Sequence, residues 1–407
     1  MTNREYHVIS AASLLGEHVA STMPATLSQT ERIRQSGLVG MGGAGFPTWK
    51  KLSFGKGCHT VIANAAECEP LLEHNVARVG TNPEEILSGL TIAMHEVGAE
   101  RGIVAIKAKH EREIAALRAA LSQAARDHSD YERDSRYDIH AGIEIGVLKD
   151  RYPAGDERAI VRDIVGELLD PQDIPSKAGV VVSNVETLMR LHRAVVDREI
   201  VTTKDITVAG EIAGSGFDNG VSLVLYDVPV GASVGDVLNA LKIHVNKDAQ
   251  LLMGGPYMGN PTTLHDDISQ TSGGIIIAGP EIRDKGPMGI IVCACGASED
   301  RLRAIAASKG ASVCAVELCK NASRLPNGRL KCLNPGVCPG QAQAVLALKK
   351  HGAQSVLISH CTDCTNTVMQ IAPKLGMRVH HASDAYMIAG REHLVRSFRK
   401  TSTTLQA

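Results

Sequence analysis

Several features are scarce in this 407-residue sequence, and each absence excludes a class of protein. No run of about 18 apolar residues is present, so we expect no helix that inserts into a bilayer. The 43 Lys and Arg nearly balance the 44 Asp and Glu, without a basic block, so we expect no nucleic acid partner. The N-terminal stretch MTNREYHVISAASLLGEHVAS lacks the apolar core of a secretion signal. These features favour a cytoplasmic protein that reaches any membrane complex through a partner.

The chain is long, has an ordinary globular composition and is rich in cysteine near its C-terminal end. Hydrophobic residues make up 44% and charged residues 21%, as in globular proteins, and 407 residues are too many for one ordinary core. The chain has ten cysteines, and the stretch from Cys293 to Cys364 holds most of them. Without a secretion signal, such a cluster indicates metal binding or redox chemistry rather than a disulfide framework.

Hydrophobic periodicity divides the chain into parts. HTVIAN, RGIVAIKA and AGIEIGVL read as short strands that alternate with amphipathic helices, which predicts an α/β domain with a parallel-rich sheet. Beyond residue 200, β-rich runs with glycine turns and one helix are typical of a β-grasp module. A cysteine-rich pattern of strands and helices then predicts an α/β C-terminal domain. We therefore expect four parts, at residues 1–30, 31–200, 201–285 and 286–407.

The stretch GMGGAGFPTWKK contains a glycine loop, Gly40 to Gly45, of the form G-x-G-x-x-G. The residues before it look helical, whereas a dinucleotide-binding Rossmann loop follows a strand, so we disfavour that fold. Bare glycine backbone still lets N–H groups approach an anion, and Lys50 or Lys51 would neutralise a phosphate. The alternative is a glycine-rich connector with a solvated lysine pair.

The next polar group follows a strand in VIANAAECEP, where Asn64, Glu67 and Glu69 are close in sequence. Carboxylates repel phosphate, so beside a phosphate loop they suit a neutral part of the ligand that carries hydroxyl or N–H groups. A flavin offers both kinds of group, and a nicotinamide carboxamide offers N–H. The alternative is a strand-end turn with solvated acids.

Four motifs in order, GMGGAGFPTWKK, VIANAAECEP, GDERAIVRDIVG and SNVETL, resemble the flavin-binding domain of RnfC-type electron-transport subunits and of the NADH-oxidising subunit of respiratory complex I. The resemblance implies that residues 31–200 bind FMN and NADH and that residues 201–285 form an SLBB-like β-grasp module. It implies NADH contacts at Phe46 and Phe54. It also implies an FMN site formed by Gly40, Gly42, Gly43, Gly45, Lys51, Asn64, Glu67, Glu69, Gly155, Glu157, Asn184 and Thr187.

Two departures from this pattern are visible. Ala66 stands where the complex I protein has an acidic residue. RnfC-type proteins end in two ferredoxin-like cysteine runs, which this chain lacks. Its cysteines leave three readings open: a redox dithiol, a bound metal, or inert packing. For the dithiol we predict Cys361 and Cys364, at the start of a helix. For an iron–sulfur cluster or zinc we predict Cys293, Cys295, Cys332 and Cys338.

The combined features resemble the electron-transfer proteins associated with D-proline reductase. The resemblance implies an NADH-dependent flavoprotein that passes electrons through FMN and C-terminal cysteines to a partner reductase such as proline reductase. One alternative is an RnfC-like or cobalamin-reductase-like subunit of an electron-transfer complex, with an iron–sulfur cluster in the C-terminal domain. Another is a non-catalytic scaffold that binds zinc.

Overall fold

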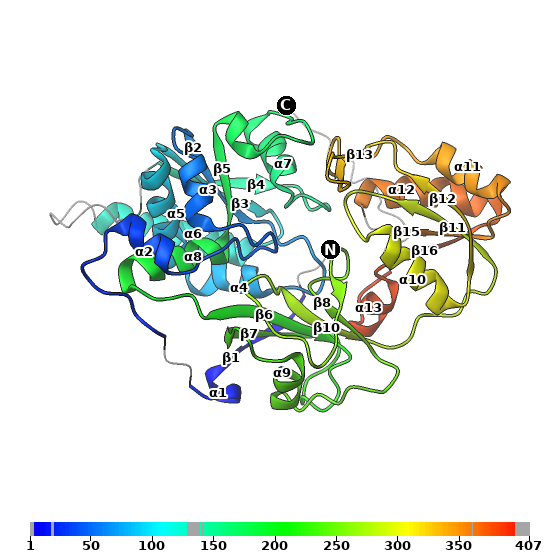
Figure 1. The fold of residues 1–407 in the computed structure, drawn as a ribbon, viewed down its shortest axis with the longest axis horizontal. Coiled ribbons are helices and arrows are strands. Elements are labelled where there is room, and N and C mark those ends of the chain that lie inside the picture. Colours follow the sequence, from blue (N-terminus) through cyan, green and yellow to red (C-terminus); the bar gives the residue numbers. More distant parts are fainter. Residues whose placement is uncertain (1–3, 18–19, 128–138, 140–141, 360, 395–407) are drawn as a thin grey trace.

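The computed structural model describes residues 4–17, 20–127, 139, 142–359 and 361–394. It confirms the α/β fold, with three larger sheets and a short two-stranded ribbon. Figure 1 shows a four-stranded sheet at the upper left, a six-stranded sheet below it and a second four-stranded sheet at the right. Among the described residues, no helix is long and apolar enough to cross a membrane.

The first sheet has four parallel strands in the order β4-β3-β2-β5. Its strands are the apolar runs expected from the sequence: β2 (Thr60–Ala65), β3 (Arg101–Lys107), β4 (Ile143–Leu148) and β5 (Val180–Asn184). Helices of seven or more residues accompany it: α2 (Gln29–Gln35), α3 (Thr48–Phe54), α4 (His74–Thr81), α5 (Pro83–Val97), α6 (Glu111–Asp127) and α8 (Val185–His192). Shorter helical segments are α7 (Glu157–Ile160), η1 (Val161–Val165), η2 (Pro175–Ala178) and η3 (Arg193–Asp197).

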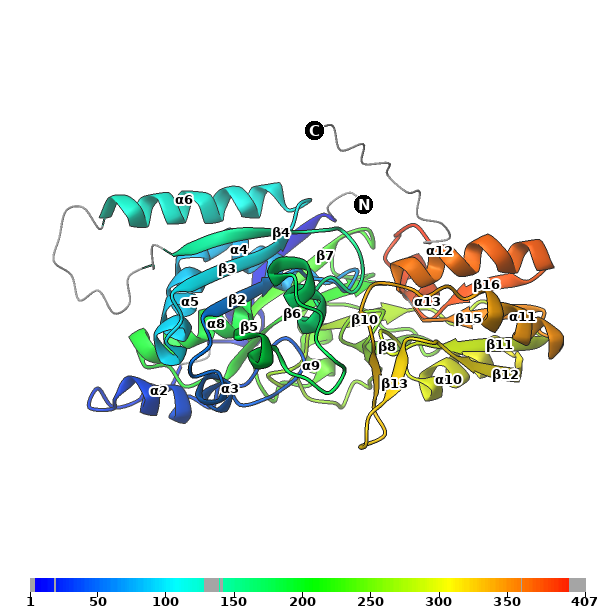
Figure 2. The same cartoon turned by 90° about the horizontal axis from the view of Figure 1, so that it is seen from above.

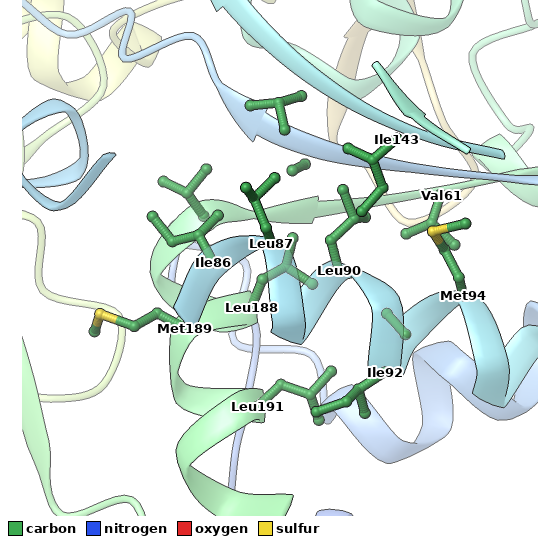
Figure 3. Close-up of a cluster of buried hydrophobic side chains, with 14 of the residues drawn as sticks. Val61, Ile86, Leu87, Leu90, Ile92, Met94, Ile143, Leu188, Met189 and Leu191 are labelled. Atoms are coloured by element: carbon green, nitrogen blue, oxygen red, sulfur yellow. The ribbon is translucent and has the colours of Figure 1, made fainter. Parts of the chain in front are cut away.

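The main core lies between this sheet and helices α5 and α8. Figure 3 shows apolar side chains of α5, among them Leu87 and Leu90, packed between the sheet and α8. Gly89 makes the close approach possible, because a Cβ there would lie 1.9 Å from the Leu188 carbonyl oxygen. This packing fixes α8, whose first turn lies beside the glycine loop.

The second sheet has the order β1-β7-β6-β10-β8-β9. Its four central strands form a β-grasp, with parallel β6 and β10 flanked by antiparallel β7 and β8. The elements are β1 (Tyr6–Ser10), α1 (Ala12–Leu15), β6 (Thr203–Gly210), β7 (Ser222–Pro229), α9 (Val234–Ala240), β8 (Gln250–Met253), β9 (Asn260–Pro261) and β10 (Gly274–Ala278). Strand β1, in a segment without a predicted element, extends the sheet by pairing in parallel with β7.

The third sheet is parallel, with the order β12-β11-β15-β16. It contains β11 (Pro287–Val292), β12 (Ser312–Leu318), β15 (Ser355–Ile358) and β16 (Arg378–His381). The connections include the ribbon of β13 (Ala322–Arg324) and β14 (Leu330–Cys332). They also include α10 (Glu299–Lys309), α11 (Ala342–Lys350), α12 (Thr362–Ile371), η4 (Ala372–Leu375) and α13 (Asp384–Ala389). Figures 1 and 2 both place β13 on the side of this sheet that faces the first sheet.

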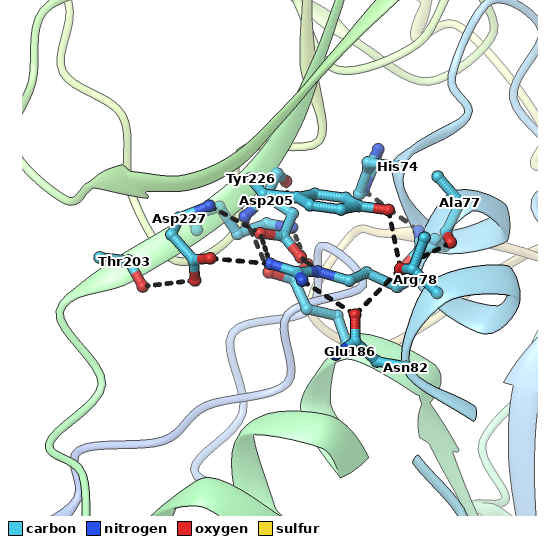
Figure 4. A network of polar contacts seen from close by, with 12 residues as sticks. His74, Ala77, Arg78, Asn82, Glu186, Thr203, Asp205, Tyr226 and Asp227 are labelled. Carbon is cyan, nitrogen blue, oxygen red and sulfur yellow. Dashed lines mark hydrogen bonds and ion pairs between the residues drawn. The ribbon is translucent and has the colours of Figure 1, made fainter. Parts of the chain in front are cut away.

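A buried ionic network joins the β-grasp sheet to α4 and α8 (Figure 4). Asp205 accepts from Arg78 Nε at 2.6 Å and from Arg190 Nη2 at 3.2 Å. The neighbouring Lys204 pairs with Glu186, and both side chains are fully buried. The guanidinium groups of Arg190 and Arg78 hold the pKa of Asp205 well below its usual range, despite the opposing effect of burial. The network therefore fixes the β-grasp sheet against the elements that carry the candidate site.

Candidate functional site

The glycine loop is a closed turn between α2 and α3. Gly40 N donates to Phe46 O at 2.9 Å, and Gly45 N donates to Gly40 O at 3.0 Å. A helix precedes the loop, which agrees with the sequence argument against a Rossmann fingerprint. The turn presents the backbone between these two bonds to the surface.

Three consecutive N–H groups at the tip of the loop remain available to a ligand. Met41 N donates to Thr187 Oγ1 at 2.9 Å, which ties the loop to α8. Within the described part of the chain, the N–H groups of Gly42, Gly43 and Ala44 donate to no protein acceptor. A Cβ on Gly42 would lie 3.1 Å from Asn184 Cβ, so glycine is needed for the close fit to α8. Such a row of unpaired N–H groups suits a phosphate.

Lys51, rather than Lys50, points into the fold beside this loop. Lys51 Nζ donates to Glu157 Oε1 at 2.7 Å and to Val182 O at 2.6 Å. Lys50 is exposed and lies over the Trp49 ring at 5.4 Å. The structure therefore brings Lys51, Glu157 and the middle of β5 together, and their role in an FMN site stays a prediction.

The turn after β2 is held in an unusual conformation. Glu67 has φ of 22°, in the left-handed region that a non-glycine residue seldom occupies. Its carboxylate accepts from Asn75 Nδ2 at 2.7 Å, and its carbonyl accepts from Lys107 Nζ at 3.1 Å. Asn75 Oδ1 in turn accepts from Asn184 Nδ2 at 3.1 Å. Burial raises the pKa of Glu67.

Glu69 is placed differently from Glu67. Its two carboxylate oxygens accept from Tyr257 N at 2.7 Å and Met258 N at 2.8 Å, in the loop between β8 and β9. Burial raises its pKa to about 7. The carboxylate is thus bonded to the β-grasp loop and not to the glycine loop.

Asn64 and Gly155 close another side of the site. Asn64 Nδ2 donates to Gly155 O at 3.0 Å, and Gly155 N donates to Cys68 Sγ at 2.9 Å. A Cβ on Gly155 would lie 3.1 Å from Cys68 Sγ and 3.2 Å from Ala66 Cβ. A side chain at this position would press on both neighbours, because the backbone turn lies close to β2 and its following loop.

Phe46 and Phe54 form an exposed aromatic pair next to the glycine loop. Their ring centroids are 6.2 Å apart, at an interplanar angle of 36°. The exposed fractions are 42% and 65%, which are large for phenylalanine. An exposed pair of this kind offers a surface on which a planar ring stacks.

One of the eight C-terminal cysteines, Cys314, packs in the core of the third sheet, and the other seven fall into two groups. The first, which we call the four-thiol cluster, contains Cys293, Cys295, Cys319 and Cys332. The four thiols lie close enough to affect one another's ionisation: the neighbouring Cys295 and Cys319 thiols lower the pKa of Cys293, and Cys293 and Cys332 raise the pKa of Cys295. Tyr152, Tyr257 and Cys68 pack against the same cluster. The cluster forms because the carboxyl ends of parallel β11 and β12 meet at one edge of the sheet.

The second group contains Cys338, Cys361 and Cys364. As predicted, β15 delivers Cys361 to the N-cap of α12. Burial outweighs the helix terminus, however, and raises the pKa of Cys361 to about 12. Cys338 packs in the same apolar cluster as Cys364, and its Sγ lies 3.6 Å from Thr367 Oγ1 on α12, so Cys338 lies with Cys364 and not with Cys293, Cys295 and Cys332. Among the described residues, no three His, Cys, Asp or Glu side chains are arranged to hold a metal ion.

Two arginines clamp the cysteine-rich part against the rest of the molecule. Arg158, at the start of α7, donates to the carbonyl oxygens of Cys332 and, at 3.0 Å, Leu333. Arg301 on α10 donates to the carbonyls of the β8–β9 loop, including Gly259 O at 2.8 Å. That loop is the one bonded to Glu69. The flavin-type site and the four-thiol cluster therefore share one interface.

Sequence reasoning missed Cys68, Asn75 and Cys319. Cys68 lay inside a quoted motif and touches both Gly155 and the four-thiol cluster. Asn75 is the second amide beside Asn64 in the same region, in the first turn of α4. Cys319 follows a strand in the same way as Cys293, and this parallel position was the available signal.

An FMN site needs hydrogen-bonding groups that match the cofactor and backbone walls that leave room for it. The glycine loop offers three unpaired N–H groups, and Lys51 offers an ammonium bonded to β5, whose last residue Asn184 lies against Gly42; both kinds of group suit a phosphate. The amides of Asn64, Asn75 and Asn184, with the Glu67 carboxylate, match hydroxyl and ring N–H groups. Gly42 and Gly155 keep the backbone walls free of side chains. The residues present fit FMN.

Comparison with known proteins agrees with this geometry. Residues 33–193 match the Nuo51 FMN-binding domain family. The cobalamin reductase PduS of Citrobacter freundii is 35% identical over 263 residues, which are 63% of this chain and 52% of the relative. A component of the ion-translocating oxidoreductase complex of Edwardsiella ictaluri is 31% identical over 247 residues, or 60% of this chain and 28% of the relative. The chain thus spans about half or less of the length of these relatives.

A solved structure shares the fold. It is the NAD⁺-reducing [NiFe]-hydrogenase in the H₂-reduced state, which matches with a TM-score of 0.50 and 22% identity. The match covers 61% of this chain and 46% of the hydrogenase chain.

Proposed function

We propose that this chain, whose residues 33–193 match an FMN-binding domain, is a flavin-dependent electron-transfer protein. It takes electrons from NADH through FMN and passes them through its C-terminal cysteines to a partner reductase. The observation that carries the proposal is the position of Cys68. This thiol accepts from Gly155 N at the candidate FMN site and packs against the four-thiol cluster.

In this proposal, one set of residues binds the FMN phosphate and another binds the neutral polar groups of the cofactor. The N–H groups of Gly42 and Gly43, together with Lys51, bind the phosphate, because unpaired backbone donors and an ammonium favour an anion. Asn75 and Glu67 bind neutral polar groups farther along the cofactor. Bound FMN supplies the exchange of electrons between a hydride donor and electron acceptors.

NADH is the proposed donor. Phe46 and Phe54 offer an aromatic surface at the mouth of the site, and stacking on it would orient a planar ring. Ala66 is small and fully buried, so no side-chain charge at this position repels the dinucleotide phosphates. Glu157, held by Lys51, accepts a hydrogen bond from the carboxamide in this arrangement.

The route onward leads through the interface that Arg158 and Arg301 hold closed. Cys68, Tyr152 and Tyr257 pack there against the four-thiol cluster. The acceptor is a partner reductase or another protein of an electron-transfer complex. Proline reductase stays a specific prediction from the sequence resemblance, as does a cytoplasmic location.

A second candidate rests on the four-thiol cluster itself. Four cysteine sulfurs gathered at one strand edge are the ligand number of an iron–sulfur cluster. In this alternative the chain is an RnfC-like or cobalamin-reductase-like protein with such a cluster. Iron and acid-labile sulfide analysis of anaerobically purified protein separates the candidates, because the thiol route requires neither element.

The experiment that tests the proposal is anaerobic reconstitution with FMN. We expect quenching of free FMN fluorescence at stoichiometric protein, and bleaching of the bound-flavin absorbance when NADH is added. Failure to bind FMN, or a bound flavin that NADH leaves oxidised, would overturn the proposal.

A further inference from the structure

We propose that Cys338 and Cys364 form a redox-active dithiol that reduces a disulfide of the acceptor. The two residues come from different connections of the third sheet: Cys338 lies just before α11, and Cys364 lies in the first turn of α12. The two side chains pack in one apolar cluster, and Cys338 Sγ lies 3.6 Å from Thr367 Oγ1, in the turn of α12 that follows Cys364. This assignment replaces Cys361 by Cys338 as the partner of Cys364.

The two sulfurs differ in exposure, as an attacking and a resolving thiol must. Cys338 is half-buried, whereas Cys364 is 3% exposed. An external disulfide therefore reaches Cys338 first. Cys364 lies behind it, in contact with Cys338 and shielded from solvent. A pair with this asymmetry forms a mixed disulfide at one sulfur and resolves it with the other.

Polar groups around Cys338 stabilise its thiolate. Gln341 Nε2 lies 3.4 Å from Cys338 Sγ, and Thr367 Oγ1 lies 3.6 Å from it. The neighbouring Cys364 thiol, and then Thr367, the Gly340 backbone and Gln341, lower the pKa of Cys338 to about 6. Cys58 is a contrast: it is 4% exposed, and burial alone raises its pKa, as in an inert core thiol.

The exchange balances in electrons and protons. Cys338 thiolate attacks one sulfur of the acceptor disulfide, whose S–S bond breaks as a mixed disulfide forms, and the released sulfur takes up a proton. Cys364 then loses its proton and attacks Cys338 Sγ, which releases the second acceptor thiol. The acceptor gains two electrons and two protons, and Cys338 and Cys364 end as a disulfide.

The pair has a structural connection to its source of electrons. Gln341 is 2% exposed, and its Nε2 contacts both Cys338 Sγ and, at 3.2 Å, Cys319 Sγ of the four-thiol cluster. Reduction of the Cys338–Cys364 disulfide requires two electrons and two protons. In this respect the inference rests on the proposed function, with NADH as reductant through bound FMN. The dithiol exchange itself requires neither NADH nor FMN.

The test therefore uses the full-length chain without added FMN or NADH. Chemically reduced protein is pulsed with iodoacetamide between pH 5 and 9, and modified peptides are quantified by mass spectrometry. We expect Cys338 to react fastest, because it is the more exposed sulfur of the pair and has polar contacts from Gln341 and Thr367. Cys314 is the matched control, because it is also half-buried and packs in the same core, with no hydrogen bond to its sulfur among the described residues.

Oxidation then identifies the pair. Glutathione disulfide is expected to convert the reduced protein to a Cys338–Cys364 disulfide, while Cys364→Ser accumulates glutathione on Cys338. Cys314→Ser should leave both results unchanged. The proposal is overturned if Cys338 reacts no faster than Cys314, or if the disulfide joins Cys361 and Cys364. A positive result without FMN binding would overturn only the proposed function.

Discussion

Lys51 Nζ lies 2.7 Å from Glu157 Oε1, and the same ammonium donates to Val182 O. These contacts fix Lys51 beside the glycine loop by groups from two other parts of the domain. An ammonium has three donors, so one remains for an anionic ligand. Glu157 therefore orients Lys51. The hydrogen bond from Lys51 to the Val182 carbonyl keeps this ion pair from moving into solvent, as a surface ion pair would.

Lys51→Ala should weaken FMN binding at least tenfold, because it removes a charge-assisted contact to phosphate worth about 1.4 kcal/mol or more. Lys50→Ala is the control, since Lys50 is exposed over Trp49 and should leave the affinity within about twofold. Fluorescence titration with FMN measures both. Equal affinity of the two variants would show that Lys51 is not a phosphate ligand.

Arg158→Gln should slow electron transfer from the flavin to the cysteines while leaving flavin reduction by NADH unchanged. The substitution removes guanidinium donors to Cys332 O and Leu333 O, which hold the four-thiol cluster against α7. Stopped-flow absorbance separates the two steps. Arg303→Gln, which breaks an exposed ion pair with Glu299 on α10, is the control. A uniform loss of both steps would point to unfolding instead.

Asp205→Ala should destabilise the protein by about 3–5 kcal/mol, because it leaves the buried Arg78 and Arg190 without their shared carboxylate. Asp218→Ala, which removes an exposed ion pair with Arg391, should cost less than about 1 kcal/mol. Urea unfolding followed by circular dichroism gives both values. Similar small losses would mean that water replaces the network in solution.

Two glycines in helices should respond oppositely to alanine. Gly89→Ala is expected to destabilise by several kcal/mol, since its Cβ would lie 1.9 Å from Leu188 O and force α5 and α8 apart. Gly80→Ala on α4 meets Glu113 Cγ at an ordinary 3.7 Å and should stabilise by up to about 1 kcal/mol through helix propensity. Thermal unfolding of both variants measures the difference. A stable Gly89→Ala protein would contradict the packing of α5 on α8.

Glu69 should make stability fall as pH rises. Burial raises its pKa from 4.5 to about 7, so between these values the folded protein binds more protons than the unfolded chain. The free energy of unfolding therefore decreases through this window and becomes independent of Glu69 above it. Glu69→Gln should flatten the profile between pH 5 and 7, as urea unfolding at several pH values can measure. An unchanged slope would assign the effect to other buried acids such as Glu73.

Apolar periodicity and glycine positions in the sequence were enough to predict the elements whose structure depends on neighbouring residues. The apolar runs became β2, β3, β4 and β5, and Gly42 of the glycine loop lies against Asn184. These segments have strong periodicity or a geometry that only glycine permits. Their positions could therefore be read without knowledge of distant contacts.

Long-range pairing could not be read in the same way. Strand β1 has a mostly exposed five-residue sequence and forms only because β7, more than 200 residues later, offers an open edge. The cysteine grouping depends on which connections of the parallel sheet meet, so spacing suggested Cys338 where the structure has Cys319. Glu69 likewise accepts a hydrogen bond from a loop of the β-grasp module, and the motif that contains Glu69 gave no sign of this contact.

The central claim is that electrons from NADH reach the cysteines through bound FMN. An anaerobic NADH titration of FMN-loaded, disulfide-oxidised protein tests it, with flavin absorbance and free thiols measured at each addition. We predict that NADH is consumed beyond the amount needed to bleach the flavin, while free thiols increase by about two for each disulfide reduced. A flavin that bleaches at one equivalent with no increase in free thiols would contradict the account.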